Sequence, residues 1–424
     1  MSYSTPEHTD KHTDLKHYDV VIAGGSFIGL ALASALSLCS DHTLQCLVVD
    51  PVSADHQNTS RFDGRASALS LGSKHLLEVL GVWSEIAGDA QPVHRMEITD
   101  SALENVLRPV FLQFDTDYGP EGPATYIVEN SVLRAGLNTV IADDPGVILS
   151  PPCAVETFEH NGHCLRLWLS DGRQCTTNLL IAADGRRSKL RKKAGIKTIG
   201  WSYDQVGLVS TVSHALPHNG HAVQHFLPSG PFARLPLTGN RCSLVWSEKK
   251  RIAERLIGLN DDDFIAEVQK RFGHDLGDLT LAGPRSHFPL SLHLARHYVT
   301  DRFALVGDAA HGVHPIAGLG LNIGLRDVAA LCEVVLDAKK LGLDFGSEAI
   351  LQRYVQWRRL DNMTSAFVMD GLNRLFSNDF MPLRTLRDIG LGLVQRSPML
   401  KDFFMKEAAG LSGSLPRLLK GERV

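Results

Sequence analysis

Short apolar runs alternate with amphipathic stretches over the first 200 residues, and this alternation predicts strands and helices in turn. Residues 19–23 are apolar and mostly β-branched, which is typical of a buried strand. The glycine-bearing stretch 24–29 then leads into a helical pattern over 30–38. A second apolar strand is predicted at 44–49, and Asp50 follows it. A strand, a glycine-rich loop, a helix and a strand in this order predict an α/β unit of the nucleotide-binding kind.

The same α/β pattern continues, and then the pattern changes after residue 200. The elements predicted next are an amphipathic helix within 60–83, a helix over 128–141, strands within 147–168 and a strand over 179–182. Short β-type runs then predict an antiparallel sheet inserted into the first domain, with strands at 205–212, 223–227, 233–237, 242–246 and 286–290 and a helix at 261–272. A last strand is predicted at 303–306, and residues from 348 onward are helical.

Composition and charge exclude several classes of protein. The net charge of −4 gives no general reason to expect a nucleic-acid partner. The seven cysteines are odd in number and form no C-x-x-C pair, which favours a reducing compartment and argues against disulfides or a zinc site. No apolar run reaches transmembrane length, and residues 1–17 lack the apolar region of a signal peptide. We therefore expect a cytoplasmic protein with a flexible tail over 1–17.

Two stretches contain candidate ligand-binding residues. In the first, Asp50 lies 21 residues after Gly29, close to the spacing of about 20 expected of a dinucleotide site. Ser26 replaces the second glycine of that fingerprint, so a purely structural strand–turn–helix is the alternative. In the second, Asp308 follows the strand at 303–306, and a glycine-rich loop leads into a helix start that suits an anionic or electron-rich ligand. The alternative interpretation is that Asp308 only caps a helix.

His311 and His314 lie three residues apart beside Asp308, and such a group is compatible with a metal site. No third or fourth ligand is evident in the sequence, so no metal is predicted. A Ser-His-Asp hydrolase is not supported either, because the chain has no G-x-S-x-G elbow.

Three segments in a fixed order carry a family resemblance: the loop at 24–29, the ADGRRSKLR segment at 183–191 and the GD pair at 307–308. Together they resemble the single-component FAD-dependent aromatic hydroxylases, and within these most closely the ubiquinone-biosynthesis hydroxylases. The resemblance covers nearly the whole chain from residue 18, and further matching segments lie at 63–70, 201–205, 230–237 and 370–377.

The resemblance implies an α/β fold. It consists of a Rossmann-like FAD-binding domain of the glutathione-reductase type, an inserted antiparallel substrate domain and C-terminal helices. The implied division is an FAD-binding domain over 18–90, 126–199 and 294–345, a substrate domain over 91–125 and 200–293, and a C-terminal helical region over 346–424.

The resemblance also implies roles for individual residues. Gly24, Gly25 and Gly29 receive the FAD pyrophosphate, Asp50 holds the ribose, and Asp308 accepts from the ribityl chain. Leu321 and Asn322 offer backbone N–H groups to the flavin, where the helix dipole stabilises negative charge. The implied cofactor-binding residues are Gly24, Gly25, Ser26, Phe27, Ile28, Gly29, Asp50, Arg65, Asp184, Gly307, Asp308, Pro315, Gly318, Leu319, Gly320, Leu321 and Asn322.

The chain departs from the family pattern at three positions. Ser26 stands in the first loop, Asn130 stands where many relatives have a cofactor-contacting arginine, and Leu319 stands where the family usually has glutamine. These departures do not argue against FAD binding, but the mechanistic roles that relatives assign to these three positions do not carry over directly.

The chemistry that the resemblance implies is hydroxylation of an electron-rich aromatic ring, that of a polyprenylated ubiquinone precursor. NADH or NADPH reduces FAD, and O2 then gives a flavin hydroperoxide, so no side-chain nucleophile is expected. Phe232, Leu235, Val245, Ile316 and Ala317 are candidates for the substrate pocket, and ordinary sheet core is the alternative for each. A flavin-binding accessory protein and another FAD-dependent oxidoreductase on the same fold are the alternative functions.

The C-terminal stretch from residue 381 has eight basic and four acidic residues with apolar residues between them. It could rest on anionic lipid at the inner face of the membrane or bind a partner, such as a biosynthetic complex or a second copy of the chain. A helix packed on the FAD domain is the alternative.

Overall fold

The first sheet of the molecule carries parallel strands at its centre. The computed structural model describes residues 15–52, 63–100, 103, 110–313, 320–376 and 397–424. The strands of this eight-stranded sheet are β1 (Lys16–Ala23), β2 (Cys46–Val49), β8 (Val147–Leu149), β9 (Val155–Asn161), β10 (Cys164–Leu169), β11 (Gln174–Ala182), β18 (Val299–Thr300) and β19 (Phe303–Leu305). Their order is β18-β19-β11-β1-β2-β8, with the hairpin β9–β10 paired to β11. The pairs β1–β2, β1–β11, β11–β19 and β2–β8 are parallel.

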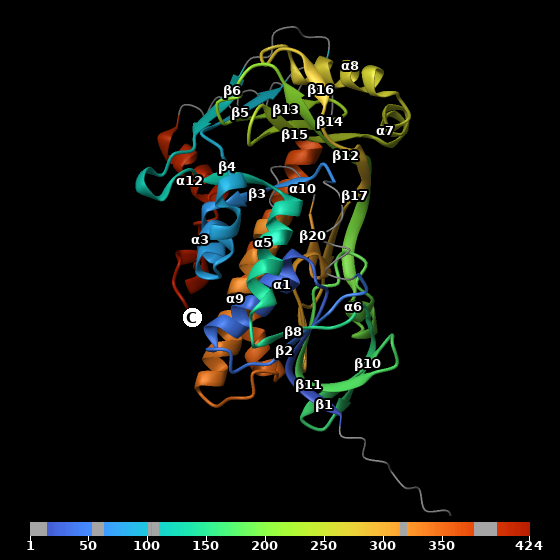
Figure 1. Cartoon of the computed structure of the whole chain (residues 1–424), viewed down its shortest axis with the longest axis vertical. Coiled ribbons are helices and arrows are strands. Elements are labelled where there is room, and N and C mark those ends of the chain that lie inside the picture. Colours follow the sequence, from blue (N-terminus) through green and yellow to red (C-terminus); the bar gives the residue numbers. More distant parts are fainter. Residues whose placement is uncertain (1–14, 53–62, 101–102, 104–109, 314–319, 377–396) are drawn as a thin grey trace, which may run out of the picture.

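Helices cover this sheet and close its core (Figure 1). They are α1 (Phe27–Cys39), α3 (Leu71–Val79), α4 (Val82–Ile86), α5 (Asn130–Ala142), α9 (Gly320–Lys340) and α10 (Glu348–Phe376). Helix α1 packs against both α5 and α9, and α9 packs against α10. Val20, Val21 and Ile22 of β1 are fully buried, as expected of a central parallel strand with cover on both faces.

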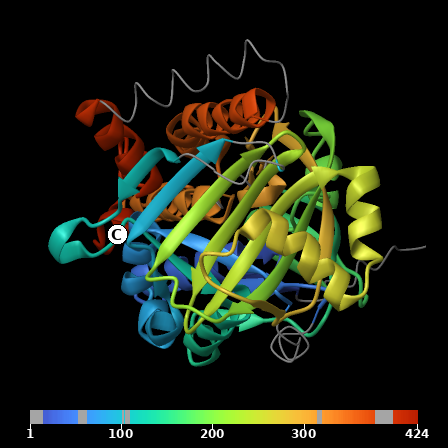
Figure 2. The same ribbon diagram turned by 90° about the horizontal axis from the view of Figure 1, so that it is seen from above.

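The second sheet has nine strands in the order β20-β17-β12-β15-β14-β13-β5-β6, with β16 beside β12. They are β5 (Arg95–Asp100), β6 (Val110–Asp115), β12 (Thr198–His214), β13 (His221–Leu227), β14 (Gly230–Leu237), β15 (Arg241–Lys249), β16 (Leu279–Leu281), β17 (Ser286–Ala295) and β20 (His311–Gly312). The pairing is antiparallel as predicted, except that β5 and β13 run parallel. Helices α7 (Lys250–Ile257) and α8 (Asp261–Phe272) lie over its outer face (Figure 2).

The remaining elements correct some of the sequence-based boundaries. A three-stranded sheet of β3 (Ala66–Ser70), β4 (Gln91–Pro92) and β7 (Thr125–Glu129) was not predicted. The sequence assigns 125–129 partly to a helix, because this stretch runs directly into α5, and 66–70 to a loop, because it has no β-branched or aromatic residue. Strand β1 begins at Lys16, inside the predicted tail 1–17.

The C-terminal region consists of two parts with different environments. Helix α12 (Pro398–Ala408) exposes large apolar side chains, with Met399 81% and Phe403 58% exposed. After it the chain returns to the first domain, where Leu418 and Leu419 are fully buried. Among the described helices, none has the length and apolar character needed to cross a membrane.

A buried carboxylate ties these layers together. Asp327 of α9 has no solvent exposure, and its Oδ2 accepts from the Gly307 backbone N–H at 3.0 Å and from His311 Nε2 at 2.5 Å. Its Oδ1 accepts from Arg358 Nε at 2.9 Å and from Asn362 Nδ2 at 3.2 Å, both on α10. Burial acts to raise the pKa of Asp327, but His311 and Arg358 outweigh it and lower that pKa to about 2. The carboxylate is therefore ionised, and it connects the loop that follows β19 with α9 and α10.

We predict that Asp327→Asn lowers the free energy of unfolding by about 3–5 kcal/mol, because it removes the fully buried carboxylate that pairs with the Arg358 guanidinium and leaves only the partly exposed Asp361 as a counter-charge. Urea denaturation measures the loss. Asp361→Asn is the matched control, since Asp361 also pairs with Arg358 at 2.9 Å but has a side chain that is 39% exposed. That variant should lose about 1 kcal/mol or less. Equal losses in the two variants would contradict this assignment.

Candidate functional site

The carboxyl ends of four neighbouring parallel strands bring the sequence-predicted residues into one line. Ala23 of β1 pairs with Val49 of β2 on one side and with Ala182 of β11 on the other. Ala182 in turn pairs with Leu305 of β19. The loops that follow therefore place Asp50, Gly24, Asp184 and Asp308 along the same sheet edge. Chain order reverses between β1 and β11, and such a switch point is where open α/β sheets bind ligands.

The first loop needs glycine because backbone groups crowd it. Gly24 has φ +117°, and a Cβ there would lie 2.3 Å from the Ala183 carbonyl oxygen. A Cβ on Gly29 would lie 1.8 Å from the Gly24 carbonyl oxygen. Ser26, Phe27 and Ile28 lie between them, and α1 begins at Phe27. The chain thus turns tightly into α1 and presents the amides of its first turn at the strand edge.

Asp50 fixes this loop to the end of β2. Its Oδ2 accepts from the Gly25 N–H at 2.6 Å, and its Oδ1 accepts from the Val52 N–H at 2.8 Å. A carboxylate oxygen has more than one lone pair, so both oxygens keep the capacity to accept from a ligand hydroxyl. Asp50 therefore shapes the loop as well as standing at the predicted ribose position.

Asp184 has a free acceptor at the same edge. Its Oδ2 accepts from the Lys189 backbone N–H at 3.0 Å, whereas its Oδ1 is buried without a hydrogen-bond partner among the described residues. Ser188 caps the short helix α6 (Lys189–Lys193) by accepting from the Arg191 N–H. The Arg191 side chain donates to the Ala309 carbonyl at 2.6 Å, which ties the Asp184 loop to the Asp308 loop.

A neutral histidine supports the Asp308 loop. His293 of β17 donates from Nε2 to the Asp308 carbonyl oxygen at 2.9 Å, because a carbonyl can only accept. Burial lowers the pKa of His293 to about 4, and the nearby guanidinium groups of Arg186 and Arg191 act in the same direction. Arg186 itself donates to the Ser291 carbonyl at 3.2 Å. The Asp308 side chain is exposed at the strand edge, while Gly307 is buried beneath it.

The late helix start lies beside the three-stranded sheet. Gly320, Leu321 and Asn322 form the first turn of α9. The Asn322 side chain accepts from the Ser70 N–H at 2.9 Å and donates to the Ala68 carbonyl at 2.8 Å. Its side chain therefore anchors β3, which leaves the backbone amide for the predicted flavin contact. Pro315, Ile316, Ala317, Gly318 and Leu319 lie outside the described residues.

Two other predicted positions engage in local contacts. Arg65 binds Asp63 through Nε at 2.7 Å. The Asn130 Oδ1 accepts from the Ser67 hydroxyl at 2.7 Å, so this amide serves the start of α5 and the edge of β3. Neither side chain forms a hydrogen bond or ion pair with the described residues of the first loop. Arg134, one turn after Asn130, lies with its guanidinium carbon 4.9 Å from the Phe27 ring centroid.

The predicted pocket residues lie on two different faces of the second sheet. Leu235 packs with Ala68 of β3 on the inner face, and Val245 lies in register with Ala233 on that same face. Phe232 instead packs edge-on against Trp246 at 5.9 Å, in the core beneath α7 and α8. This corrects the prediction for Phe232, which strand alternation directs away from the first domain.

Sequence reasoning also missed a polar link between the second sheet and α10. Trp201 Nε1 and the Tyr203 hydroxyl both donate to Asp370 Oδ1, at 3.1 and 2.8 Å. The segments 201–205 and 370–377 both carry the family resemblance, but nothing in their spacing indicates that they meet. Leu292 and Val313 line the apolar cluster beside Trp201 and Tyr203, close to the Asp308 loop.

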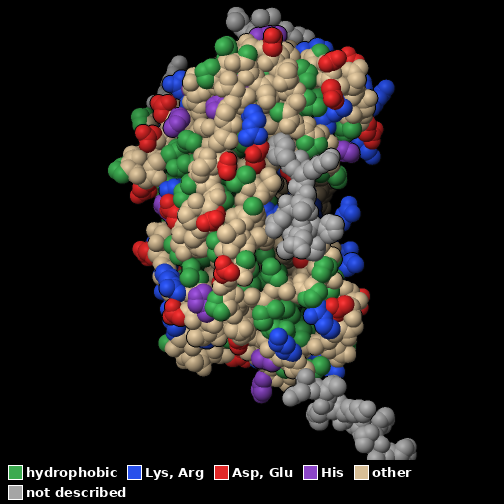
Figure 3. Space-filling model, viewed as in Figure 1, with side chains coloured by type: hydrophobic (Ala, Val, Ile, Leu, Met, Phe, Trp, Pro, Cys, Tyr) green, Lys and Arg blue, Asp and Glu red, His purple; other side chains and the backbone are tan. Residues whose placement is uncertain are grey.

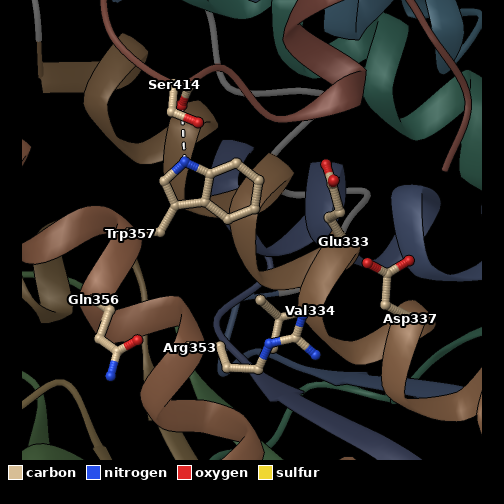
Figure 4. A pocket seen from close by; sticks show the side chains of 7 residues that line it. All are labelled: Glu333, Val334, Asp337, Arg353, Gln356, Trp357 and Ser414. Atoms are coloured by element: carbon tan, nitrogen blue, oxygen red, sulfur yellow. Dashed lines mark hydrogen bonds between the residues drawn. The ribbon is translucent and has the colours of Figure 1, made fainter.

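A hollow of about 500 Å³ lies elsewhere, between α9, α10 and the C-terminal segment (Figure 4). Trp357 Nε1 donates there to the Ser414 carbonyl at 2.8 Å. The carboxylates of Glu333 and Asp337 bind Arg417 at 3.1 and 2.6 Å. This hollow therefore belongs to the packing of the C-terminal segment and not to the strand-end site.

Comparison with known proteins shows the family of this chain. The family described as "FAD binding domain" matches residues 17–361. The chain belongs to this FAD-binding family. It is 40% identical to the ubiquinone hydroxylase UbiL of Rhodospirillum rubrum over 406 residues, which cover 95% of this chain and 92% of that protein. It is 35% identical to the 3-demethoxyubiquinol 3-hydroxylase of Escherichia coli, with 93% and 98% covered.

The fold agrees with that of FAD-dependent monooxygenases. The crystal structure of p-nitrophenol 4-monooxygenase PnpA from Pseudomonas putida has a TM-score of 0.76 and 17% sequence identity, with 94% of this chain and 99% of that chain covered. The residues of this chain also fit FAD on their own geometry. A Cβ would fill the cradle at Gly24, and the buried Asp184 Oδ1 offers an acceptor that the described protein groups leave unused.

We predict that His293 makes this FAD-binding protein less stable in mild acid. Its folded-state pKa of about 4 lies below the usual value near 6.5, so stability falls as the pH drops from 6.5 towards 4. Urea denaturation of the apoprotein at pH 8 and pH 5 should show that wild type loses roughly 2 kcal/mol more than His293→Gln. Glutamine keeps a donor for the Asp308 carbonyl but does not titrate. Identical pH dependence in both proteins would refute the role of His293.

Proposed function

We propose that this chain is an FAD-dependent monooxygenase that hydroxylates the aromatic ring of a ubiquinone precursor, with a polyprenylated phenol as its substrate class. The observation that carries the proposal is the line of strand ends at Asp50, Gly24, Asp184 and Asp308, in a chain 40% identical to a ubiquinone hydroxylase. The two relatives named above both act, by their names, on ubiquinone or its precursors.

In this proposal each part of the strand edge has a distinct task. The first turn of α1, with Gly24, Gly25 and Gly29, receives the pyrophosphate, and Asp50 accepts from the ribose. Asp308 accepts from the ribityl chain, while the neutral His293 holds its backbone without adding charge. The first turn of α9 directs its amides and dipole at the ring system. When bound, FAD supplies the redox and oxygen chemistry, and the protein supplies position, electrostatics and exclusion of water.

The two sheets divide the work between cofactor and substrate. We assign FAD to the first domain (18–90, 126–199 and 294–345) and the substrate to the second (91–125 and 200–293). Leu235 and Val245, on the inner face of the second sheet, then line the pocket together with Ile316 and Ala317. The Asp370 link to Trp201 and Tyr203 holds the second sheet at a fixed position relative to α10.

NADH or NADPH serves as the reductant in this proposal. The segment that follows Asp184 supports this assignment, because Arg187, Lys189 and Lys192 are exposed there and carry the positive charge that an anionic dinucleotide requires. Dimers or a larger biosynthetic complex are the proposed assembled forms, and the protein acts in the cytoplasm or at the inner face of the membrane.

Oxygen consumption tests the proposed reaction. Purified protein with bound FAD and NADPH or NADH should consume O2 several times faster when a prenylated phenol of the quinone-precursor class is added, and mass spectrometry should show the phenol gaining one oxygen atom. Bound FAD with no substrate-dependent oxygen uptake would instead favour the flavin-binding accessory protein. Absence of bound flavin after gentle purification would reject both functions.

Helix α12 supplies a surface for peripheral membrane contact. Met399, Leu400, Phe403 and Phe404 are exposed on it. On the face seen in Figure 3, which includes α12 as labelled in Figure 1, apolar side chains lie among acidic and basic ones. A helix that exposes several large apolar side chains suits the boundary between headgroups and acyl chains, where a polyprenyl tail resides.

We predict that the double variant Phe403→Ser, Phe404→Ser binds lipid vesicles about tenfold or more weakly, because each phenyl ring buried in the bilayer contributes on the order of 1.5–3 kcal/mol. Co-sedimentation with vesicles that contain anionic lipid measures the effect. Leu341→Ser is the control, since Leu341 is 70% exposed and lies directly after the end of α9. Unchanged sedimentation of the double variant would remove α12 from the membrane contact.

A further inference from the structure

Basic side chains are concentrated around α6, directly after the Asp184 loop. Seven of the twelve residues over 186–197 are Lys or Arg, and none is acidic. The pairing of β12 with β17 adds Arg296, whose backbone N–H donates to the Lys197 carbonyl at 2.8 Å. In Figure 3, Lys and Arg side chains lie along the side of the molecule on which Figure 1 labels α6. The fold therefore gathers positive charge here, although the whole chain has a net charge of −4.

Most of these cations have no counter-charge within the described part of the chain. Six of their side chains are exposed and form no hydrogen bond or ion pair there: Arg187, Lys189, Lys192, Lys193, Lys197 and Arg296. The Asp184 carboxylate accepts from the Lys189 backbone N–H and not from its ammonium group. Glu156 and Glu159 of β9, which packs against α6, form no ion pair with the described basic residues. An anion bound among these cations would reduce their mutual repulsion.

A hollow of about 460 Å³ lies within this basic cluster. The residues that line it are Arg191, Lys192, Gly195, Ile196, Lys197 and Thr198. The Arg191 guanidinium already donates to the Ala309 and Arg186 carbonyls. Lys192 and Lys197 are therefore the lining cations that are left for a ligand. An ammonium group offers three donors and binds phosphate as a point charge, so the hollow suits a phosphate group.

The position of the hollow indicates which kind of phosphate it binds. Arg191 lines the hollow and also ties the Asp184 loop to the Asp308 loop, so the hollow borders the strand edge at which FAD is proposed to bind. Helix α12, the proposed membrane contact, lies on the opposite side of the molecule from α6 in Figure 1. This arrangement favours a soluble phosphate-bearing ligand that must reach the flavin over a lipid headgroup.

We propose that Lys192 and Lys197 bind the 2′-phosphate of NADPH and make this chain selective for NADPH over NADH. The two coenzymes differ only by this phosphate monoester, so the two lysines act on one coenzyme and not on the other. The remaining cations of the cluster raise the local concentration of the anionic coenzyme. The assignment rests on the reductant named in the proposed function, and it specifies which of the two coenzymes that reductant is.

Calorimetric titration of the FAD-loaded protein with NADP⁺ and NAD⁺, which bind without reducing the flavin, tests the assignment. Wild type should bind NADP⁺ about tenfold or more tightly than NAD⁺. The double variant Lys192→Gln, Lys197→Gln should lose about tenfold or more in affinity for NADP⁺ and keep its Kd for NAD⁺ within about twofold. The matched control is Lys249→Gln, Lys250→Gln, which removes two exposed lysines where β15 meets α7 and should leave both Kd values unchanged.

Equal affinity of wild type for NADP⁺ and NAD⁺, or equal losses for both in the double variant, would overturn the assignment. So would a double variant that keeps its NADP⁺ affinity but binds phosphatidylglycerol vesicles much more weakly, because the lysines would then serve lipid headgroups. If the NADP⁺ selectivity is present and is lost as expected, but NADPH does not reduce the bound flavin, the phosphate site stands and the reductant of the proposed function fails instead. Thermal unfolding of each variant verifies that it folds.

Discussion

A carboxylate without solvent contact, that of Asp327, connects three segments that are far apart in sequence. It accepts from the Gly307 amide, from His311 and from Arg358, so one ionised group fixes the loop after β19 against α9 and α10. A buried charge of this kind is tolerated only when its partners are complete, which makes the positions of those partners interdependent. The Asp308 loop and the start of α9, which form one side of the proposed FAD site, therefore depend on this network.

The sequence predicted the strand edge of the site because that edge is built from local signals. Apolar runs ended at Gly24, Asp50, Asp184 and Asp308, and parallel strands bring such ends together whatever their separation in sequence. Helix α8 was predicted with the same boundaries that it has in the structure, since Asp261 and Gly273 delimit a clear amphipathic period. The short strands β3 and β7 are not predicted, because the sequence does not show that these two segments pair with each other.

What the sequence could not show are the contacts made across long separations. Nothing near Asp327 in sequence indicates Arg358, and nothing near His293 indicates the Asp308 carbonyl. Phe232 was placed on the wrong face because an apolar strand does not reveal which of its two faces meets the neighbouring domain.

The order of strands in the first sheet has a consequence for how the chain acquires its cofactor during synthesis. β1 is made first, but its neighbour β11 ends at Ala182, and β19 follows only at Phe303–Leu305. The buried Asp327 needs Arg358 beyond that point. Domains fold as units as they leave the ribosome, and long-range pairs form late. The strand edge that carries Gly24 is therefore complete only after most of the polypeptide has been made, so the proposed FAD site exists in a nearly finished protein and not in a nascent amino-terminal domain.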